Sequence, residues 1–165
     1  MQLTESDVTA WGEQIGRTAA VPLVIALRGD LGAGKTTLAR AIARGAGISG
    51  PVPSPTYNLL IRYRGKRGVA VVHVDLYRLE DPEEVWELGW SELPEEDEMV
   101  LIEWPERAEG LLPEPRWEIT LSEVEEGEAG EQPGPRAMIE PRALRRVEVR
   151  PVGEPPPIPL PGENG

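Results

Sequence analysis

The sequence contains no cysteine, no phenylalanine and only one histidine, His73. Without cysteine there can be no disulfide scaffold, no cysteine-ligated zinc or iron–sulfur centre and no thiol catalysis. A single histidine argues against a histidine-rich metal site and leaves a serine hydrolase only that residue as its base. Because phenylalanine is absent, tryptophan must supply the large aromatic side chains of a core.

Positive charge is also scarce. Lysine and arginine number 17 against 29 acidic residues, which gives a net charge of −12 at pH 7. Such a charge repels phosphodiester backbones and argues against a generic nucleic-acid binder. The apolar stretch at residues 21–27 is far too short to span a bilayer, and no charged-then-apolar signal region opens the chain. We therefore expect a soluble, cytoplasmic protein with no membrane partner.

The length of 165 residues suits one domain or one domain with a tail. Glycine and proline number 18 each, and prolines crowd the end of the chain. From residue 151 the sequence PVGEPPPIPLP excludes a helix or a central strand. We expect a single domain at residues 1–150 and a disordered tail at residues 151–165.

The hydrophobic pattern predicts an α/β protein. Residues 5–18 have helical spacing behind a capping pair, Thr4 and Asp7. Residues 22–27 and 99–103 are continuous apolar runs, which are typical of strands buried on both faces of a parallel sheet. Between them, a strongly helical segment begins at Lys35 and is followed by stop signals at Gly45 and Gly47.

Further elements are predicted at the sides of this sheet. Residues 59–63 and 69–74 suit a hairpin, and residues 82–89 suit a short helix with proline first and glycine last. Residues 117–121 alternate like an edge or antiparallel strand, to which residues 137–139 would pair.

The most specific motif is the run from Gly29 to Thr36, which matches the phosphate-loop pattern GxxxxGK[ST]. Its glycines allow successive N–H groups to converge on phosphate oxygens, and the following helix points its positive end at the same place. Lys35 would bridge β- and γ-phosphates, and the Thr36 hydroxyl would ligate Mg²⁺. The pattern predicts a nucleoside triphosphate site.

A phosphate-loop enzyme also needs an acid at the end of a buried strand. Asp75 and Glu103 each follow such a strand, and parallel strands deliver their carboxyl ends to one crevice. The pattern alone does not choose between them. His73, as a lone histidine in an alternating strand, is expected to be structural. The basic cluster Arg62, Arg64, Lys66 and Arg67 suits a solvated hairpin tip, with a docking patch as the alternative.

Five motifs occur in order along the chain: GDLGAGKTT from Gly29, SPTY from Ser54, HVDLYR from His73, DPEE from Asp81 and IEWP from Ile102. Together they resemble the TsaE (YjeE) family, the ATPase component of bacterial tRNA threonylcarbamoyladenosine (t6A) biosynthesis. The resemblance covers about residues 5 to 140. It implies a P-loop NTPase-type fold of three layers, with a mostly parallel central sheet and antiparallel additions. It also implies that the domain binds ATP or ADP with Mg²⁺ and hydrolyses ATP slowly.

The resemblance also assigns site residues. Catalysis would involve Lys35, Asp75 and Glu103, and Mg²⁺ would involve Thr36, Glu103 and Asp75. The phosphate loop itself would comprise Leu31, Gly32, Ala33, Gly34, Lys35, Thr36 and Thr37. Further nucleotide contacts would come from Thr56, Trp104, Glu106, Arg136 and Glu5.

The function implied is a Mg²⁺-dependent ATPase, slow alone and dependent on partners, that serves t6A formation with TsaD and TsaB. TsaD would transfer the threonylcarbamoyl group, so tRNA would be reached only through these partners. The chain alone would be a monomer or a weak oligomer. Two alternatives stay open: a small-molecule kinase with the same loop, and a nucleotide-gated binding module with negligible turnover.

Overall fold

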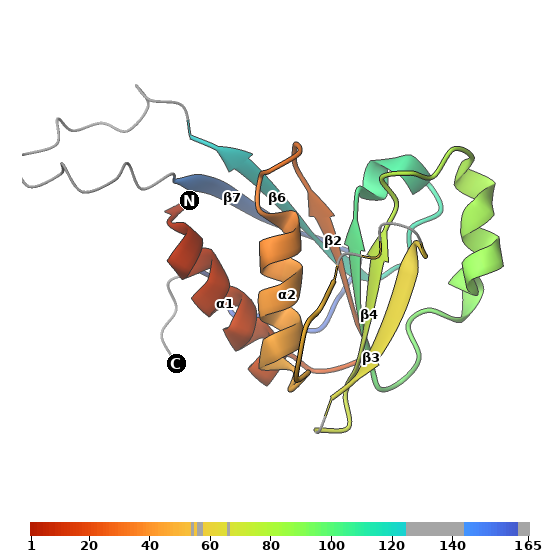
Figure 1. Ribbon diagram of the computed structural model, residues 1–165, viewed down its shortest axis with the longest axis horizontal. Coiled ribbons are helices and arrows are strands. Elements are labelled where there is room, and N and C mark those ends of the chain that lie inside the picture. The colour runs from red at the N-terminus through yellow and green to blue at the C-terminus, as the bar shows by residue number, and fades with distance from the viewer. Residues whose placement is uncertain (54, 56–57, 66, 125–143, 162–165) are drawn as a thin grey trace, which may run out of the picture.

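The computed structural model describes residues 1–53, 55, 58–65, 67–124 and 144–161 (Figure 1). The regular elements follow the order β1 (Gln2–Leu3), α1 (Glu5–Thr18), β2 (Leu23–Arg28), α2 (Lys35–Gly45), β3 (Leu60–Arg64), β4 (Ala70–Asp75), η1 (Pro82–Leu88), η2 (Trp90–Glu92), β5 (Glu98–Glu103), η3 (Pro105–Ala108), β6 (Arg116–Glu123) and β7 (Arg145–Val152), where η marks a 3₁₀ helix.

One seven-stranded sheet runs through the molecule in the order β1-β7-β6-β2-β5-β4-β3. Its centre is parallel, since β2 pairs in parallel with both β5 and β6, and β4 pairs in parallel with β5. The hairpin of β3 with β4 and the pairs of β7 with β6 and β1 are antiparallel. The predicted fold, a mostly parallel sheet with antiparallel additions, is confirmed.

The two α-helices lie side by side on one face of the sheet (Figure 1). Helix α1 begins behind the predicted capping box of Thr4 and Asp7. Glycines let the helices approach closely, because a Cβ at Gly16 would lie 2.0 Å from the Ile42 carbonyl oxygen and one at Gly45 would lie 2.2 Å from that of Glu13. The core between helices and sheet includes Trp11.

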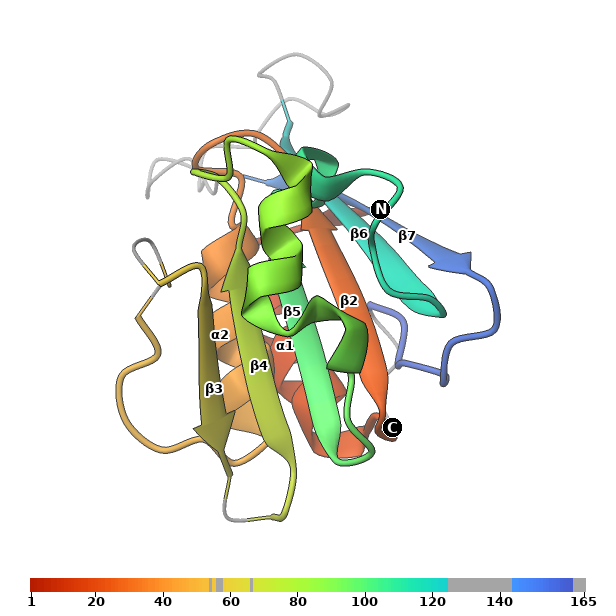
Figure 2. The ribbon, with the colours of Figure 1, turned by 90° about the vertical axis from the view of Figure 1, so that its right-hand side faces the viewer.

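The opposite face of the sheet is covered by the 3₁₀ segments, which lie in front of β4 and β5 in Figure 2. They enclose a second core that includes Val72, Val74 and Trp90. The predicted short helix at residues 82–89 is the 3₁₀ helix η1, capped by Asp81 and ended by Gly89. Within the described parts of the chain, no helix is long and apolar enough to cross a membrane.

Strand β6 is antiparallel on one side, as its alternation predicts, but it is not an edge strand. It lies inside the sheet, parallel to β2 on one side and antiparallel to β7 on the other. Its partner is β7 (Arg145–Val152); the predicted partner, residues 137–139, lies outside the described residues. The alternation arises because one face of β6 packs into the core while the other is only partly covered.

The proline-rich end differs from the expected disordered tail as far as residue 161. Pro151 belongs to β7, although proline has no backbone N–H to donate to a neighbouring strand. Strand β1 pairs with β7 only at Arg145 and Arg146, so at Pro151 that side of β7 has no strand that would need the missing hydrogen bond. Beyond β7 the chain packs on the domain. Ile158 is buried, and the indole N–H groups of Trp11 and Trp117 donate to carbonyl oxygens of this segment, at 2.7 and 2.8 Å.

The hairpin tip carries arginines whose charge is balanced within the fold. Arg62 pairs with Glu98 at 2.7 Å and with Glu95 at 3.5 Å, and Arg64 pairs with Asp97 at 3.6 Å. Lys66 lies outside the described residues. The acidic turn before β5 therefore offsets the basic cluster, which favours a solvated tip over a docking patch.

Candidate nucleotide-binding site

Strands β4 and β5 deliver polar side chains to the sheet face that α2 covers. Val71 and Leu101 belong to the core on that face, and strand alternation places His73, Asp75 and Glu103 on the same side. Asp75 lies directly opposite Glu103 in the parallel register. Asp75 and Glu103, between which the sequence pattern did not choose, therefore lie next to each other at the ends of neighbouring strands.

The phosphate loop connects β2 to α2 through glycines that need their conformational freedom. Gly29 has a φ of 137°, and a Cβ there would lie 2.1 Å from the Leu121 carbonyl oxygen. Gly34 has a φ of 105° and caps α2 without a side-chain hydrogen bond. The first amides of α2 are therefore not capped by a side chain of the loop, which suits an anion at this helix end.

A cavity of about 390 Å³ opens at this loop. It is lined by most of the predicted site residues and by two others: Leu31, Gly32, Gly34, Lys35, Thr36, Thr37, Asp75, Tyr77, Arg78, Glu103 and Trp104. Tyr77 and Arg78 were not predicted as site residues. Their signal was their place in the HVDLYR motif, two and three residues after Asp75.

Lys35 is only 5% exposed at the base of this cavity. Its ammonium donates to the carbonyl oxygens of Gly29 at 2.5 Å and Asp30 at 2.7 Å, and it lies 4.0 Å from the centre of the Trp104 ring. Burial lowers the pKa of Lys35, while nearby carboxylates, Glu103 foremost, oppose that shift. The ammonium is thus held at the loop by carbonyl dipoles and an aromatic face.

Trp104 occupies an uncommon backbone conformation for a non-glycine residue, with φ 57° and ψ 47°. This turn, followed by η3, brings the indole back over Lys35. The Tyr77 ring packs against it with centroids 4.8 Å apart, and Arg107 lies 5.9 Å from the centre of the Tyr77 ring. One wall of the cavity is therefore aromatic.

Glu103 is buried and its two oxygens receive different donors. Thr36 Oγ1 donates to Oε2 at 2.9 Å, and His73 Nε2 lies 2.7 Å from Oε1. Asp75 Oδ1 accepts from the Tyr77 backbone N–H at 3.0 Å.

The oxygen atoms gathered at this site are of the kind that Mg²⁺ prefers. They are a hydroxyl and neighbouring carboxylates, and the Thr36 hydroxyl gives its hydrogen to Glu103, which leaves its lone pairs for a cation. Among the described residues, no group of three or more acidic, histidine or cysteine side chains forms a complete metal cage.

The other predicted contacts are spread around the loop. Glu5, Ala33 and Thr37 line a smaller cavity of about 70 Å³ on the α1 side of the loop. Glu106 does not line the main cavity and instead pairs with Arg28 at 3.9 Å. Thr56 and Arg136 lie outside the described residues, so their predicted nucleotide contacts stay predictions.

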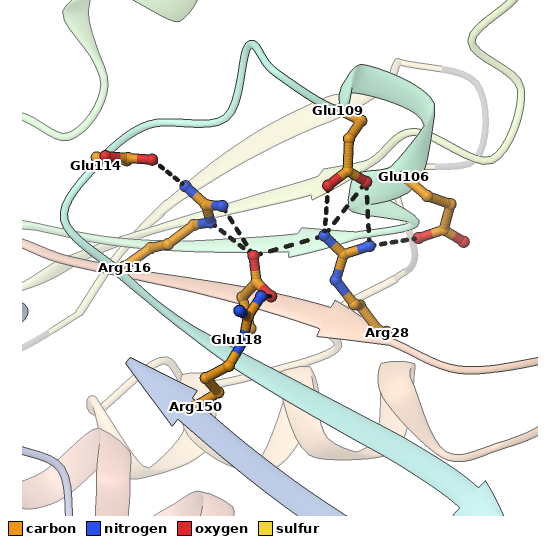
Figure 3. Close-up of polar contacts among 7 residues, drawn as sticks. All are labelled: Arg28, Glu106, Glu109, Glu114, Arg116, Glu118 and Arg150. Carbon is orange, nitrogen blue, oxygen red and sulfur yellow. Dashed lines mark hydrogen bonds and ion pairs between the residues drawn. The ribbon is translucent and has the colours of Figure 1, made fainter. Parts of the chain in front are cut away.

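An ion-pair network, not predicted from the sequence, lies beside the site (Figure 3). Arg28, directly before the phosphate loop, joins Glu109 at 3.3 Å and Glu118 at 3.5 Å. The buried Glu118 also receives Arg116 at 2.8 Å and Arg150. Burial alone would raise the pKa of Glu118, but hydrogen bonds from Arg150 and Arg116 and the charge of Arg28 outweigh it and hold the pKa at about 2.

Comparison with known proteins agrees with the motifs. The family model described as "Threonylcarbamoyl adenosine biosynthesis protein TsaE" matches residues 3–131. The chain belongs to the TsaE family. The predicted resemblance is confirmed, and membership supports a nucleotide-binding role for the phosphate loop.

Curated TsaE relatives include one from Haemophilus influenzae, 48% identical over 92 residues, which cover 56% of this chain and 58% of the relative. The TsaE of Treponema pallidum is 36% identical over 121 residues, which cover 73% of this chain and 88% of the relative. The crystal structure of Bacillus subtilis YdiB superposes with a TM-score of 0.62 at 23% identity, covering 93% of this chain and 87% of that one. The last comparison shows a shared fold.

Proposed function

We propose that this TsaE chain is the Mg²⁺-dependent ATPase of t6A biosynthesis and that it acts with TsaD and TsaB. The observation that carries the proposal is the meeting of Lys35 and Thr36, at the start of α2, with Glu103 at the end of the neighbouring parallel strand. Family membership supports the place in t6A biosynthesis.

Phosphate binding falls to the loop and Lys35. The amides at the start of α2 and the helix dipole attract phosphate oxygens. The Lys35 ammonium, now hydrogen-bonded to the carbonyls of Gly29 and Asp30, transfers to the β- and γ-phosphate oxygens. Trp104 shields this charge from water on one side and thereby strengthens it.

Glu103 and Asp75 have different roles, the first in metal binding and the second in orienting the attacking water. Mg²⁺, held by Thr36 with Glu103 behind it, would neutralise charge on the phosphate oxygens. Asp75, beside Glu103 on the next strand, orients a water for attack on the γ-phosphorus. The bond from that phosphorus to the β–γ bridging oxygen breaks, ADP departs with this oxygen, and the proton of the attacking water passes to the released phosphate.

The partners are expected to meet the mouth of the cavity. Leu31 is 79% exposed and Tyr77 is 44% exposed, and both line the cavity, so two large side chains with apolar surface are accessible at the nucleotide site. With a net charge of −12, the chain is unsuited to hold tRNA itself. The nucleotide state would control docking through the segment from Asp75 to Arg78, which combines cavity residues with exposed ones.

The test is phosphate release from ATP, with and without TsaD and TsaB, together with a reconstituted t6A assay. Lys35→Ala should abolish both activities, as should Glu103→Ala. The only other lysine supplies a matched control, since Lys66→Ala should leave both unchanged. Undiminished ATP turnover in Lys35→Ala would contradict the assignment of this cavity as the ATP site. Turnover that requires an added acceptor would indicate a kinase, and tight binding without turnover in the full assembly would indicate a binding module.

A further inference from the structure

His73 has a buried ring atom without a partner. It is the one such case among buried side-chain nitrogen and oxygen atoms in the described part of the chain: Nδ1 makes no hydrogen bond. The other nitrogen, Nε2, lies 2.7 Å from Glu103. We propose that His73 is a positioning residue that fixes the Glu103 carboxylate for cation binding. This inference rests on the proposed function.

The His73 ring makes one polar contact, the one from Nε2 to Glu103. His73 is completely buried on β4, where its neighbours on the same face are the apolar Val71 and the acidic Asp75. An ionised carboxylate can only accept, so Nε2 carries the hydrogen and Nδ1 is left as a bare acceptor. A buried unpaired polar atom costs about 1–3 kcal/mol, and an apolar residue at position 73 would avoid that cost. Packing alone therefore does not account for a histidine here.

The contact with His73 completes the restraint of Glu103. Oε1 receives the His73 ring while Oε2 receives the Thr36 hydroxyl, so the carboxylate cannot rotate without losing a donor. With Glu103 fixed, Thr36 keeps its hydrogen directed at the acid and its lone pairs directed at the cavity. Without His73, the carboxylate would be free to turn toward the Lys35 ammonium, whose charge it already influences. In such an ion pair Glu103 would no longer be available for the cation, and Lys35 would no longer be available for the phosphates.

Metal affinity separates this role from a merely structural one. The measurement is Mn²⁺ binding, followed by electron paramagnetic resonance, in the presence of a non-hydrolysable ATP analogue. His73→Leu removes the donor at similar volume and should weaken Mn²⁺ binding about 10–100-fold, as loss of outer-shell partners does. His73→Gln restores an N–H donor and should recover most of the affinity. Binding of the analogue without a divalent cation should not change.

A matched control comes from the same strand face. Val71→Ala shortens a buried side chain two residues away and should lower stability without changing Mn²⁺ affinity. Mn²⁺ affinity in folded His73→Leu within twofold of the wild type would overturn the proposal while leaving the proposed function intact. Failure of the wild type to bind Mn²⁺ with the analogue would overturn both.

The unmutated protein provides a second measurement that does not depend on how the variants fold. Because the chain has one histidine, ¹⁵N-labelled protein shows a single imidazole by NMR. The proposal expects the hydrogen on Nε2 and its protection from exchange with water. A ring carrying its hydrogen on Nδ1 would overturn the proposal, because Nε2 could not then donate to the carboxylate.

Discussion

Two buried carboxylates, Glu103 on β5 and Glu118 on β6, are supplied with hydrogen-bond donors in opposite ways. Glu118 receives three arginines, Arg28, Arg116 and Arg150 (Figure 3). Glu103 receives a threonine hydroxyl and a histidine ring and, among the described residues, no arginine.

This difference separates a carboxylate that stabilises the fold, Glu118, from one that serves the functional site, Glu103. A buried carboxylate is costly unless opposite charge compensates it. At Glu118 the compensation is built into the fold, which lowers its pKa and ties β6 to β7 and to the end of β2. At Glu103 the donors orient the carboxylate without a fixed cationic partner, so a cation can still be attracted to the site. Substitutions at the two positions should therefore damage different properties.

The largest effect is expected for Glu118→Ala. Removing the acid leaves the largely buried Arg28 and Arg116 side by side without it, and breaking a buried pair in this way costs about 3–5 kcal/mol of unfolding free energy. Urea denaturation followed by circular dichroism measures it. Glu123→Ala on the same strand is the control, because Glu123 is exposed and its pair with Arg145 should contribute about 0.2–1 kcal/mol. Equal losses from both variants would contradict the structural role of Glu118.

Glu103→Gln should produce the opposite result. The amide keeps the shape and an acceptor for one of its donors but loses the charge, so ATP turnover should fall about 10²–10³-fold, equivalent to about 2.7–4 kcal/mol of barrier. Its unfolding free energy should stay within about 1 kcal/mol of the wild type. Steady-state phosphate release and urea denaturation on the same preparation measure both. A variant that unfolds while retaining turnover per folded molecule would reverse the assignment.

The loss of stability at low pH should depend on the protonation of Glu118. Its pKa of about 2 lies below its ordinary value of 4.5, so the unfolded chain binds the proton more readily. The stabilisation is therefore complete above about pH 4.5 and is lost as the pH falls from about 4.5 to about 2. Its size is about 3 kcal/mol. Denaturation curves across this range should be steeper in pH for the wild type than for Glu118→Gln, and parallel curves would contradict the account.

The smallest effect is expected for Arg150→Ala. Although its guanidinium contacts Glu118, the Arg150 side chain is 70% exposed, so its pair is screened by water and should contribute at most about 1 kcal/mol. Arg116→Ala, a largely buried partner of the same acid, should cost more. A larger loss for Arg150→Ala than for Arg116→Ala, measured by urea denaturation, would show that burial does not rank these partners.

Local patterns were sufficient where one segment determines its own structure. The capping box before α1, the apolar runs of β2 and β5, and the glycine loop before α2 all follow from neighbouring residues. The same patterns bring Asp75 and Glu103 together, because parallel strands end at one edge of the sheet.

Contacts between distant segments could not be predicted in this way. The position of β6 inside the sheet depends on β7, more than 20 residues later, and the packing of the proline-rich end depends on indoles at Trp11 and Trp117. The network at Glu118 joins four separate segments, and the bond from His73 to Glu103 crosses strands. Alternation within a single strand does not specify such partners.

The most direct test is the rise in melting temperature that Mg²⁺ and a non-hydrolysable ATP analogue cause in Glu103→Gln and Glu118→Gln. A ligand at 100 times its Kd adds about 2.7 kcal/mol of stability, which raises the melting temperature of a chain of this size by roughly 5–10 °C. Glu118→Gln should melt lower than the wild type and yet show the full rise, whereas Glu103→Gln should melt like the wild type and lose the magnesium-dependent part of it. A full magnesium-dependent rise in Glu103→Gln, or its loss in Glu118→Gln, would contradict the division of roles.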